Sequence, residues 1–222
     1  MLARISLGRV GHSLPTKELL AFQLAHAKAR DAVWDQLNST SFVHLSTLNV
    51  HSAASSRAIY LRRPDLGRRL ADPEKLAKGD YDAVIILADG LSATAVHRQA
   101  GPVLDALLPL LEGWRLAPIV IVEQGRVAIS DEIGERLGVK MSVILIGERP
   151  GLSSPDSLGA YLTWSPRVGR TDAERNCVSN IREEGLKPTL AARRIAMLME
   201  AARSRQLSGV GLSGAMSLGG SN

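Results

Sequence analysis

Side chains with nucleophilic or metal-binding chemistry are few in this sequence of 222 residues, and their spacing forms no catalytic group. The single cysteine, Cys177, has no histidine nearby to act as its base, so an ordinary buried cysteine is the simplest interpretation. All five histidines lie between residues 12 and 97, and none belongs to a ligand pair such as H-E-x-x-H. A G-x-S-x-G nucleophile turn is also absent. The sequence therefore predicts no catalytic residue and no metal site of its own.

Three short segments combine glycine with polar side chains and are the best candidates for contact with a ligand. They are Asp89-Gly90-Leu91-Ser92, Glu123-Gln124-Gly125-Arg126-Val127 and Gly147-Glu148-Arg149-Pro150-Gly151. Each follows an apolar run, and ligands of open α/β sheets bind beyond the carboxyl ends of the strands. Glycine lets a ligand approach the backbone, and carboxylates accept hydrogen bonds. The alternative is that these residues only cap helices and form turns.

A dinucleotide-binding pattern, G-x-G-x-x-G, also occurs at residues 209–214. Its mechanism requires a strand before it and a helix after it, so that the helix N-terminus meets the pyrophosphate. Here it follows an expected helix and continues into a stretch rich in Gly and Ser. We therefore reject it as a nucleotide site.

The strands expected to carry the three loops are continuous apolar runs at 83–88, 118–122 and 141–146, with a fourth candidate at 160–164. Runs without polar alternation are typical of strands that are buried on both faces of a parallel sheet. Helices are expected between them, and again at 189–205, where apolar residues recur at helical spacing. This alternation predicts an α/β fold with a doubly wound, mostly parallel sheet.

The two ends of the chain differ from this middle part. A helix is expected at 17–33 from the helical spacing of its apolar residues, and a less regular stretch follows it. The last residues are rich in Gly and Ser, which is typical of a flexible segment. We therefore predict a smaller, mainly helical region at 1–79, the sheet domain at 80–206 and a flexible tail at 207–222.

The amino-acid composition excludes several classes of protein and of binding partner. Apolar residues make up 45% of the chain, which excludes a disordered protein, and no run approaches the roughly 20 apolar residues of a membrane span. The formal charge is +5, but only 4% of residues are aromatic, which disfavours nucleic acid as a partner. The N-terminal residues MLARISLGRV contain no apolar signal segment, so a cytoplasmic location is expected.

Several longer segments have a distinctive sequence. The most specific are ERPGLSSPDSLG at 148–159 and RNCVSNI at 175–181, supported by YLRRPDLGRRL at 60–70 and GRVAISDEIGERLG at 125–138. Together they resemble the small (light) subunit of ethanolamine ammonia-lyase over about residues 3–206. The alternative is a stand-alone α/β module that binds a nucleotide or RNA through its positive charge.

The resemblance implies a Rossmann-like fold and an accessory role in an adenosylcobalamin-dependent lyase, which converts ethanolamine to acetaldehyde and ammonia. It implies the large subunit as the partner in a hetero-oligomer, with cobalamin enclosed between the two chains, in the cytoplasm or in a bacterial microcompartment. Some of the arginines at 62, 63, 68 and 69 are expected to face that partner. Because no acid, base or radical-handling group is recognisable here, the chain is expected to be inactive alone.

The family's cobalamin-binding positions correspond to Val127, Glu148 and Cys177. Glu148 would accept hydrogen bonds from the amide side chains of the corrin, although a salt bridge to Arg149 or Arg170 is the alternative. Val127 would offer backbone groups and apolar surface, and Cys177 a soft contact. The chain has no Asp-x-His-x-x-Gly loop, so cobalamin is expected to keep its own nucleotide base on cobalt.

Overall fold

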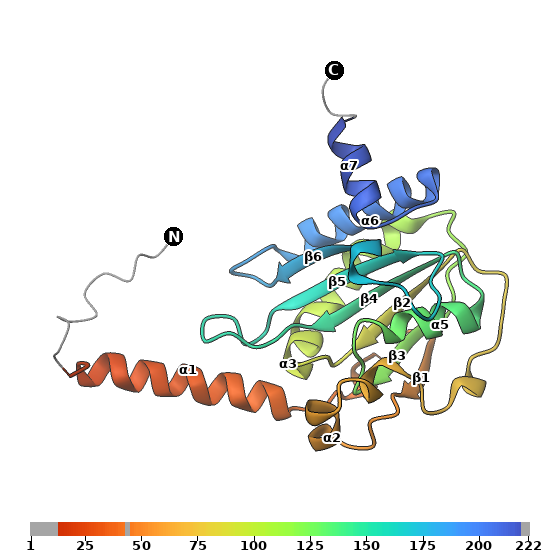
Figure 1. The fold of residues 1–222 in the computed structure, drawn as a ribbon. Coiled ribbons are helices and arrows are strands. Elements are labelled where there is room, and N and C mark those ends of the chain that lie inside the picture. The colour runs from red at the N-terminus through yellow and green to blue at the C-terminus, as the bar shows by residue number, and fades with distance from the viewer. Residues whose placement is uncertain (1–12, 43–44, 219–222) are drawn as a thin grey trace.

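The apolar runs of the sequence form the centre of a six-stranded sheet. The computed structural model describes residues 13–42 and 45–218. The strand order is β1 (Thr47–His51), β3 (Ile119–Glu123), β2 (Ala83–Ala88), β4 (Met141–Gly147), β5 (Leu158–Trp164) and β6 (Arg175–Ile181) (Figure 1). The α/β class and the four expected strands are thus confirmed.

The sheet is mixed, with three parallel and two antiparallel strand pairings, so the expected Rossmann-like, doubly wound arrangement is not confirmed. Strands β1, β3, β2 and β4 are parallel to one another, whereas β5 runs antiparallel to β4, and β6 runs antiparallel to β5. A parallel connection needs a crossover of about a dozen residues or more. The segments 148–157 and 165–174 are shorter than that and contain no long helix, so the chain reverses at each of them.

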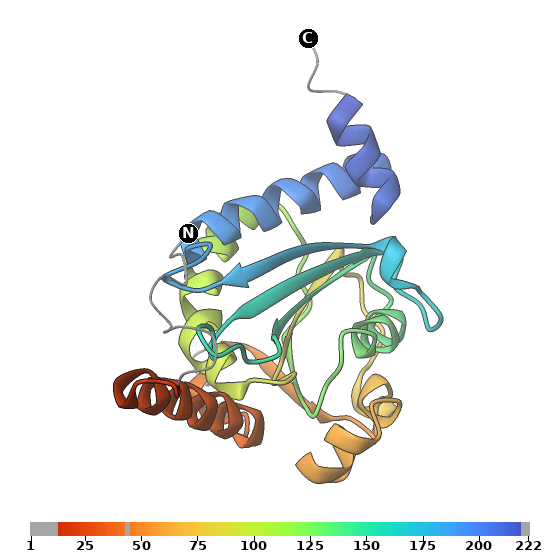
Figure 2. The same cartoon turned by 60° about the vertical axis from the view of Figure 1, so that its left-hand side comes forward.

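Helices cover both faces of the sheet. The α-helices of the described part of the chain are α1 (Thr16–Trp34), α2 (Arg57–Arg62), α3 (Ala93–Ala95), α4 (Gly101–Leu107), α5 (Ile129–Leu137), α6 (Pro188–Arg205) and α7 (Val210–Leu218). A π-helical turn, η4 (Val96–Ala100), joins α3 to α4, and the 3₁₀ turns are η1 (Ser39–Phe42), η2 (Leu66–Arg68), η3 (Pro73–Lys75), η5 (Leu108–Leu111) and η6 (Asp172–Glu174). Figure 2 shows the sheet between α6 on one face and α5 on the other.

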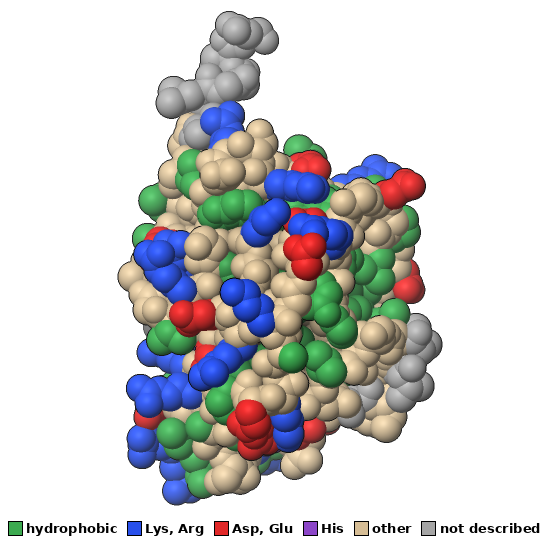
Figure 3. Space-filling model, turned by 90° about the vertical axis from the view of Figure 1, so that its right-hand side faces the viewer, with side chains coloured by type: hydrophobic (Ala, Val, Ile, Leu, Met, Phe, Trp, Pro, Cys, Tyr) green, Lys and Arg blue, Asp and Glu red, His purple; other side chains and the backbone are tan. Residues whose placement is uncertain are grey.

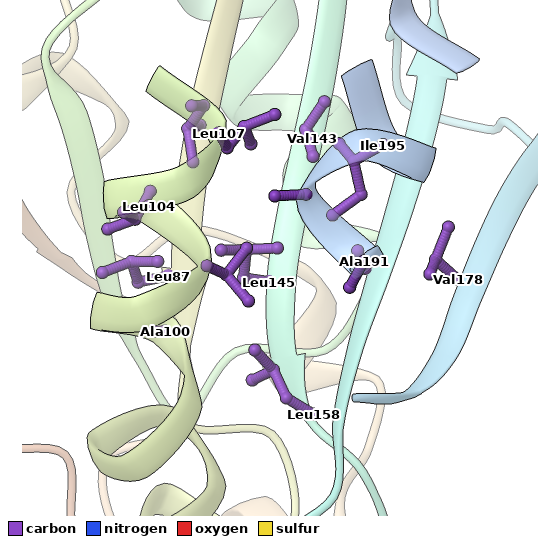
Figure 4. Packing of buried hydrophobic residues seen from close by; sticks show 14 of the residues in the cluster. Leu87, Ala100, Leu104, Leu107, Val143, Leu145, Leu158, Val178, Ala191 and Ile195 are labelled. Carbon is purple, nitrogen blue, oxygen red and sulfur yellow. The ribbon is translucent and has the colours of Figure 1, made fainter. Parts of the chain in front are cut away.

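Alternate residues of the central strands supply two hydrophobic cores. In β2, Ile85 and Leu87 point into the core beneath α4 and α6, whereas Val84 and Ile86 point into the core beneath α5. Figure 4 shows the first core, where α4 and α6 pack side by side over the sheet. Each fully buried Leu or Ile contributes about 1.5–3 kcal/mol relative to an exposed one. These cores hold the strand ends, and therefore the loops that follow them, in fixed positions.

Two parts of the fold differ from the expected organisation. Strand β1 lies within residues 1–79, which were expected to be mainly helical, and it pairs with β3 at the edge of the sheet. The expected flexible tail contains α7, whose Leu212 is fully buried in the first core. The rejected glycine pattern at 209–214 follows α6 and is not preceded by a strand, so it lacks the context of a nucleotide site.

Helix α1 lies along the margin of the fold beside α3, and its N-terminal end projects from the molecule (Figure 1). Among its residues only Ala32 is buried, whereas Leu19, Leu20, Phe22 and Leu24 are 42–58% exposed. The N-terminal residues MLARISLGRV lie outside the described part of the chain. No helix in the described part is both long and apolar enough to cross a membrane.

The surface charge is mixed rather than uniformly basic. Figure 3 shows the face turned away from α1, where Lys and Arg side chains gather along one margin and also lie beside acidic side chains over the rest of the face. Several basic residues form ion pairs at the surface, for example Arg63 with Asp65 at 2.7 Å. Arg63 is therefore already paired within its own chain.

Candidate functional site

The carboxyl ends of β2, β3 and β4 meet at a hollow of about 370 Å³. Its lining residues come from all three predicted loops and from α2, β4 and β5; they are Tyr60, Gly90, Leu91, Arg126, Val127, Ile146, Gly147, Glu148, Arg149 and Tyr161. The structure thus brings Val127 and Glu148 together in one site. A larger hollow, of about 590 Å³, lies between α1 and α3 and contains none of the predicted ligand residues.

Glu148 is positioned by bonds to one of its two carboxylate oxygens. Its Oε2 accepts hydrogen bonds from the Ser157 hydroxyl at 2.5 Å and from the Asn180 backbone N–H at 3.2 Å. Its Oε1 accepts no hydrogen bond from the described residues. Neither Arg149 nor Arg170 forms an ion pair with it, so the alternative of a salt bridge is wrong. One carboxylate oxygen therefore remains available as an acceptor.

Cys177 lies beside the hollow rather than in its lining. It is an exposed residue of β6 and pairs across the sheet with Tyr161 of β5, which does line the hollow. Partial burial of the thiol raises its pKa, as does the negative charge of Glu148, although a hydrogen bond with Tyr161 opposes the shift. The thiol is therefore protonated at neutral pH and is not an activated nucleophile.

A buried ion pair holds the loops around the hollow. The guanidinium of Arg57 on α2 lies 3.2 Å from the carboxylate of Asp89, and the two side chains are only 4% and 1% exposed. Asp89 also accepts hydrogen bonds from the backbone N–H groups of Gln124 at 3.0 Å and Gly125 at 3.1 Å. Arg57 in turn donates to the Gly90 carbonyl at 2.9 Å. Asp89 is therefore used to position the loops that follow β2 and β3.

Tyr60 also contacts the loop after β3, through a hydrogen bond and through its ring. Its side chain is fully buried, and its hydroxyl donates a hydrogen bond to the Gly125 carbonyl at 3.0 Å. The guanidinium groups of Arg57 and Arg126 lie 4.8 and 4.3 Å from the centre of its ring. Burial raises the pKa of Tyr60 well above its ordinary value, so the hydroxyl keeps its proton as a donor.

The close approach of two loops requires glycine. Gly90 has a φ of +55°, and a Cβ there would overlap the Gly147 carbonyl oxygen, which accepts a hydrogen bond from the Leu91 N–H at 2.9 Å. A Cβ at Gly147 would overlap the Ser92 carbonyl oxygen in return. The glycines expected from the sequence to permit close contact therefore bring protein backbones together.

Sequence reasoning missed Arg57, Tyr60 and Tyr161. Arg57 bonds to Asp89, 32 residues further along the chain, and Tyr60 bonds to Gly125, 65 residues further along. No local pattern marks such a partner. The only sequence signal for Tyr60 is its place at the start of the segment YLRRPDLGRRL.

Comparison with known proteins places the whole chain in one family. A sequence profile of the family described as "Ethanolamine ammonia-lyase light chain" matches residues 1–213. The chain belongs to the ethanolamine ammonia-lyase light chain family. A relative from Pseudomonas aeruginosa, named "Ethanolamine ammonia-lyase small subunit", is 56% identical over 95% of this chain and 83% of its own length. Relatives of the same name from Ralstonia nicotianae and Azotobacter vinelandii are 54% and 56% identical, over 94% and 95% of this chain and 83% and 84% of their own lengths.

Membership of the ethanolamine ammonia-lyase family confirms the resemblance inferred from the sequence. The enzyme is a carbon–nitrogen lyase, and this light chain works as a subunit of a complex. Within the described residues of the light chain, no group of three or more His, Cys, Asp or Glu side chains could hold a metal ion. Its candidate site is the hollow lined by loops at the carboxyl ends of β2, β3 and β4.

Proposed function

We propose that this light chain holds adenosylcobalamin in the hollow at the carboxyl ends of β2, β3 and β4, together with the large subunit of the lyase. One observation carries the proposal: Val127 and Glu148, which match cobalamin-binding positions of the family, line the same hollow. Cys177, the third such position, contacts the lining residue Tyr161. Val127 and Glu148, which are 21 positions apart along the chain, thus line one hollow, and Cys177 lies beside it.

The residues present fit a corrinoid. The free Oε1 of Glu148 can accept a hydrogen bond from an amide side chain of the corrin, and an ionised carboxylate is the stronger kind of acceptor. Val127 offers apolar surface beside it. When bound, adenosylcobalamin supplies the radical chemistry, whereas this chain supplies orientation and contact. The light chain is accordingly proposed to be inactive by itself.

The hollow is too small to enclose the whole cofactor, which indicates that a second chain completes the site. A hollow of about 370 Å³ is at the lower end of pockets for drug-sized ligands, and a corrinoid is much larger. The loop 148–157, which begins at Glu148, also reaches α1, where Leu24 and Pro155 line a hollow of about 320 Å³. The exposed apolar side chains of α1 therefore adjoin the cofactor loops, and we assign this continuous surface to the large subunit.

The proposal is tested by assembling the complex with and without this chain. Large subunit, light chain and the mixture are each incubated with adenosylcobalamin and desalted, and the retained corrin absorbance and the lyase activity are measured. Retention and activity are expected in the mixture only. Steeply salt-dependent binding of an oligonucleotide by the light chain alone, without retained corrin, would support the stand-alone RNA-binding alternative. A cytoplasmic location, with or without a microcompartment, stays a prediction.

Replacing Glu148 with Gln is expected to weaken cofactor retention by the assembled enzyme about tenfold or more. The remaining oxygen of Gln can keep the bonds to Ser157 and Asn180, but an NH₂ donor would then replace the acceptor that points away from them. Loss of one hydrogen bond to a charged group accounts for a change of this size. The dissociation constant of adenosylcobalamin is measured by titration of the complex.

Glu112→Gln is the matched control, because Glu112 is exposed and lies outside the hollow. It should leave cofactor affinity unchanged, and both variants should unfold at the wild-type temperature. Wild-type affinity in Glu148→Gln would count against the assigned role of Glu148.

A further inference from the structure

A second cavity, of about 510 Å³, opens beside the candidate cofactor hollow. The two share Arg126, Val127 and Tyr161. The other residues of the second cavity come from the chain around η2, the start of α5 and the connection between β5 and β6; they are Pro64, Arg68, Ala128, Arg170, Thr171, Asp172 and Arg175. Four arginines and a single acidic residue thus line a cavity that adjoins the cofactor hollow.

Two of these arginines are already neutralised within the chain. Arg175 forms a bidentate pair with Asp131, with both N–O distances at 2.7 Å and both side chains 2% exposed. Arg170 pairs with Glu174. These two arginines therefore line the cavity, but their positive charge is already balanced by carboxylates of the chain.

Arg68 and Arg126 have no carboxylate partner among the described residues. The guanidinium of Arg126 lies over the ring of Tyr60, and its Nη2 reaches the Tyr60 carbonyl only at 3.5 Å. Its Nε is buried and has no hydrogen-bond partner. Because Nε has no accessible surface, the terminal nitrogens of Arg126 are the donors that can meet an anion in the cavity that this residue lines. Arg68 is exposed and adds a second positive charge at the same cavity.

The start of α5 supplies two further donors. The backbone N–H groups of Val127 and Ala128, which line the cavity, form no hydrogen bond with other described residues, whereas those of Ile129 and Ser130 bond to preceding carbonyls. Helix α5 has nine residues, so its N-terminal end carries a partial positive charge. Two arginines without a carboxylate partner and two backbone amides without an internal acceptor thus belong to residues that line the same cavity.

We propose that this cavity binds the phosphodiester in the nucleotide loop of the cofactor. The inference rests on the proposed function, because the cavity adjoins the hollow assigned to the corrin. Four arginines against the carboxylates of Asp131, Asp172 and Glu174 leave one net positive charge, which matches the single negative charge of a phosphodiester. Guanidinium groups also match the geometry of phosphate oxygens.

The test compares two cofactors in the assembled complex of light chain and large subunit. Adenosylcobinamide lacks the nucleotide loop, and with it the phosphodiester. Arg68→Gln and Arg126→Gln are each expected to weaken adenosylcobalamin about tenfold and to leave the affinity for adenosylcobinamide unchanged. Arg194→Gln is the control, because Arg194 is exposed on α6 and lies outside the lining of both hollows. It should change neither affinity.

Equal weakening of both cofactors, or of neither, by Arg68→Gln would overturn the assignment. This variant changes an exposed side chain, so the test stands even if Arg126→Gln, which also loses its contact with Tyr60, folds poorly. Inorganic phosphate should compete with adenosylcobalamin but not with adenosylcobinamide. Phosphate that binds the complex without competing with adenosylcobalamin would assign the cavity to free phosphate and overturn the proposal.

Comparison of Glu148→Gln with the arginine variants distinguishes a failure of this inference from a failure of the proposed function. If Glu148→Gln weakens both cofactors while the arginine variants weaken neither, only the phosphodiester assignment fails. If Glu148→Gln has no effect on either cofactor, the proposed function fails.

Discussion

Replacing Asp89 with Asn is expected to lower the free energy of unfolding by about 3–5 kcal/mol and to abolish retention of cobalamin by the assembled enzyme. The change leaves the guanidinium of Arg57 buried without its counter-charge. The backbone N–H groups of Gln124 and Gly125 bond to different oxygens of the carboxylate, so the new NH₂ group of Asn also faces one of these two donors in place of an acceptor. The loops that carry Gly90 and Val127 therefore lose their common anchor. Chemical denaturation of the isolated light chain, followed by cofactor titration of the complex, measures both effects.

Asp65→Asn is the matched control, since Asp65 also pairs with an arginine, Arg63, but at the exposed surface. It should change stability little, because exposed ion pairs contribute little. Wild-type stability in Asp89→Asn would show that the buried pair does not hold the loops.

The stability loss in Asp89→Asn should depend on pH, because folding changes the affinity of Asp89 for a proton. Burial raises the pKa of Asp89 to about 6, above its ordinary value near 4, although Arg57 opposes the shift. A group with a raised folded pKa contributes stability that is present at low pH and is lost as the pH rises through about 6. The difference in stability between wild type and the variant should therefore widen as the pH falls from 7 to 5.

Replacing Gly147 with Ala is expected to destabilise the light chain by about 1–3 kcal/mol or more and to distort the hollow. A Cβ there would overlap the Ser92 carbonyl oxygen and lie only 2.5 Å from the Asp89 carbonyl oxygen. Both obstacles are backbone atoms, so no side chain can rotate away to make room. The loop after β2 must move away from β4, and Glu148 moves with its neighbour. Thermal unfolding and cofactor titration measure the two effects.

Gly101→Ala provides the control for Gly147→Ala. A Cβ at Gly101 meets no atom within 4 Å, and the residue opens helix α4, where alanine is favoured over glycine. Its unfolding temperature should be unchanged or higher. Equal effects of the two substitutions would mean that the close approach at Gly147 is unimportant.

The sequence predicts the centre of the fold well because burial there is uniform. All residues of β2 and β4 are buried, and such strands read as continuous apolar runs. In α6, the stripe that includes Ala191, Ile195 and Met199 is buried as its spacing predicts. The secondary structure of these elements can therefore be predicted from their own residues.

The edges of the fold are not visible in the sequence, because their structure depends on distant partners. Strands β1 and β6 are the two edge strands, and their residues alternate irregularly between buried and exposed. Helix α7 follows Gly209, whose backbone N–H and carbonyl are both bonded by the Asn176 side chain. Such contacts override a local composition rich in Gly and Ser.

The candidate site, too, can be predicted from the sequence only in part. The rule that ligands lie beyond the carboxyl ends of parallel strands brings Val127 and Glu148 to the same edge of the sheet, and the structure agrees. The supporting residues Arg57 and Tyr60 come from α2, and only the folded chain brings them to the loops after β2 and β3. Sequence reasoning can thus predict which loops form the site, but not what holds them.

Hydrogen exchange in the assembled complex tests most directly whether these loops form half of a cobalamin site. Backbone exchange is compared by mass spectrometry with and without adenosylcobalamin. Slower exchange is expected in segments 124–129, 147–151 and 176–181 of the light chain, with no change in residues 189–200 of α6 on the far face of the sheet. Protection confined to the large subunit, with these three segments unchanged, would contradict the account.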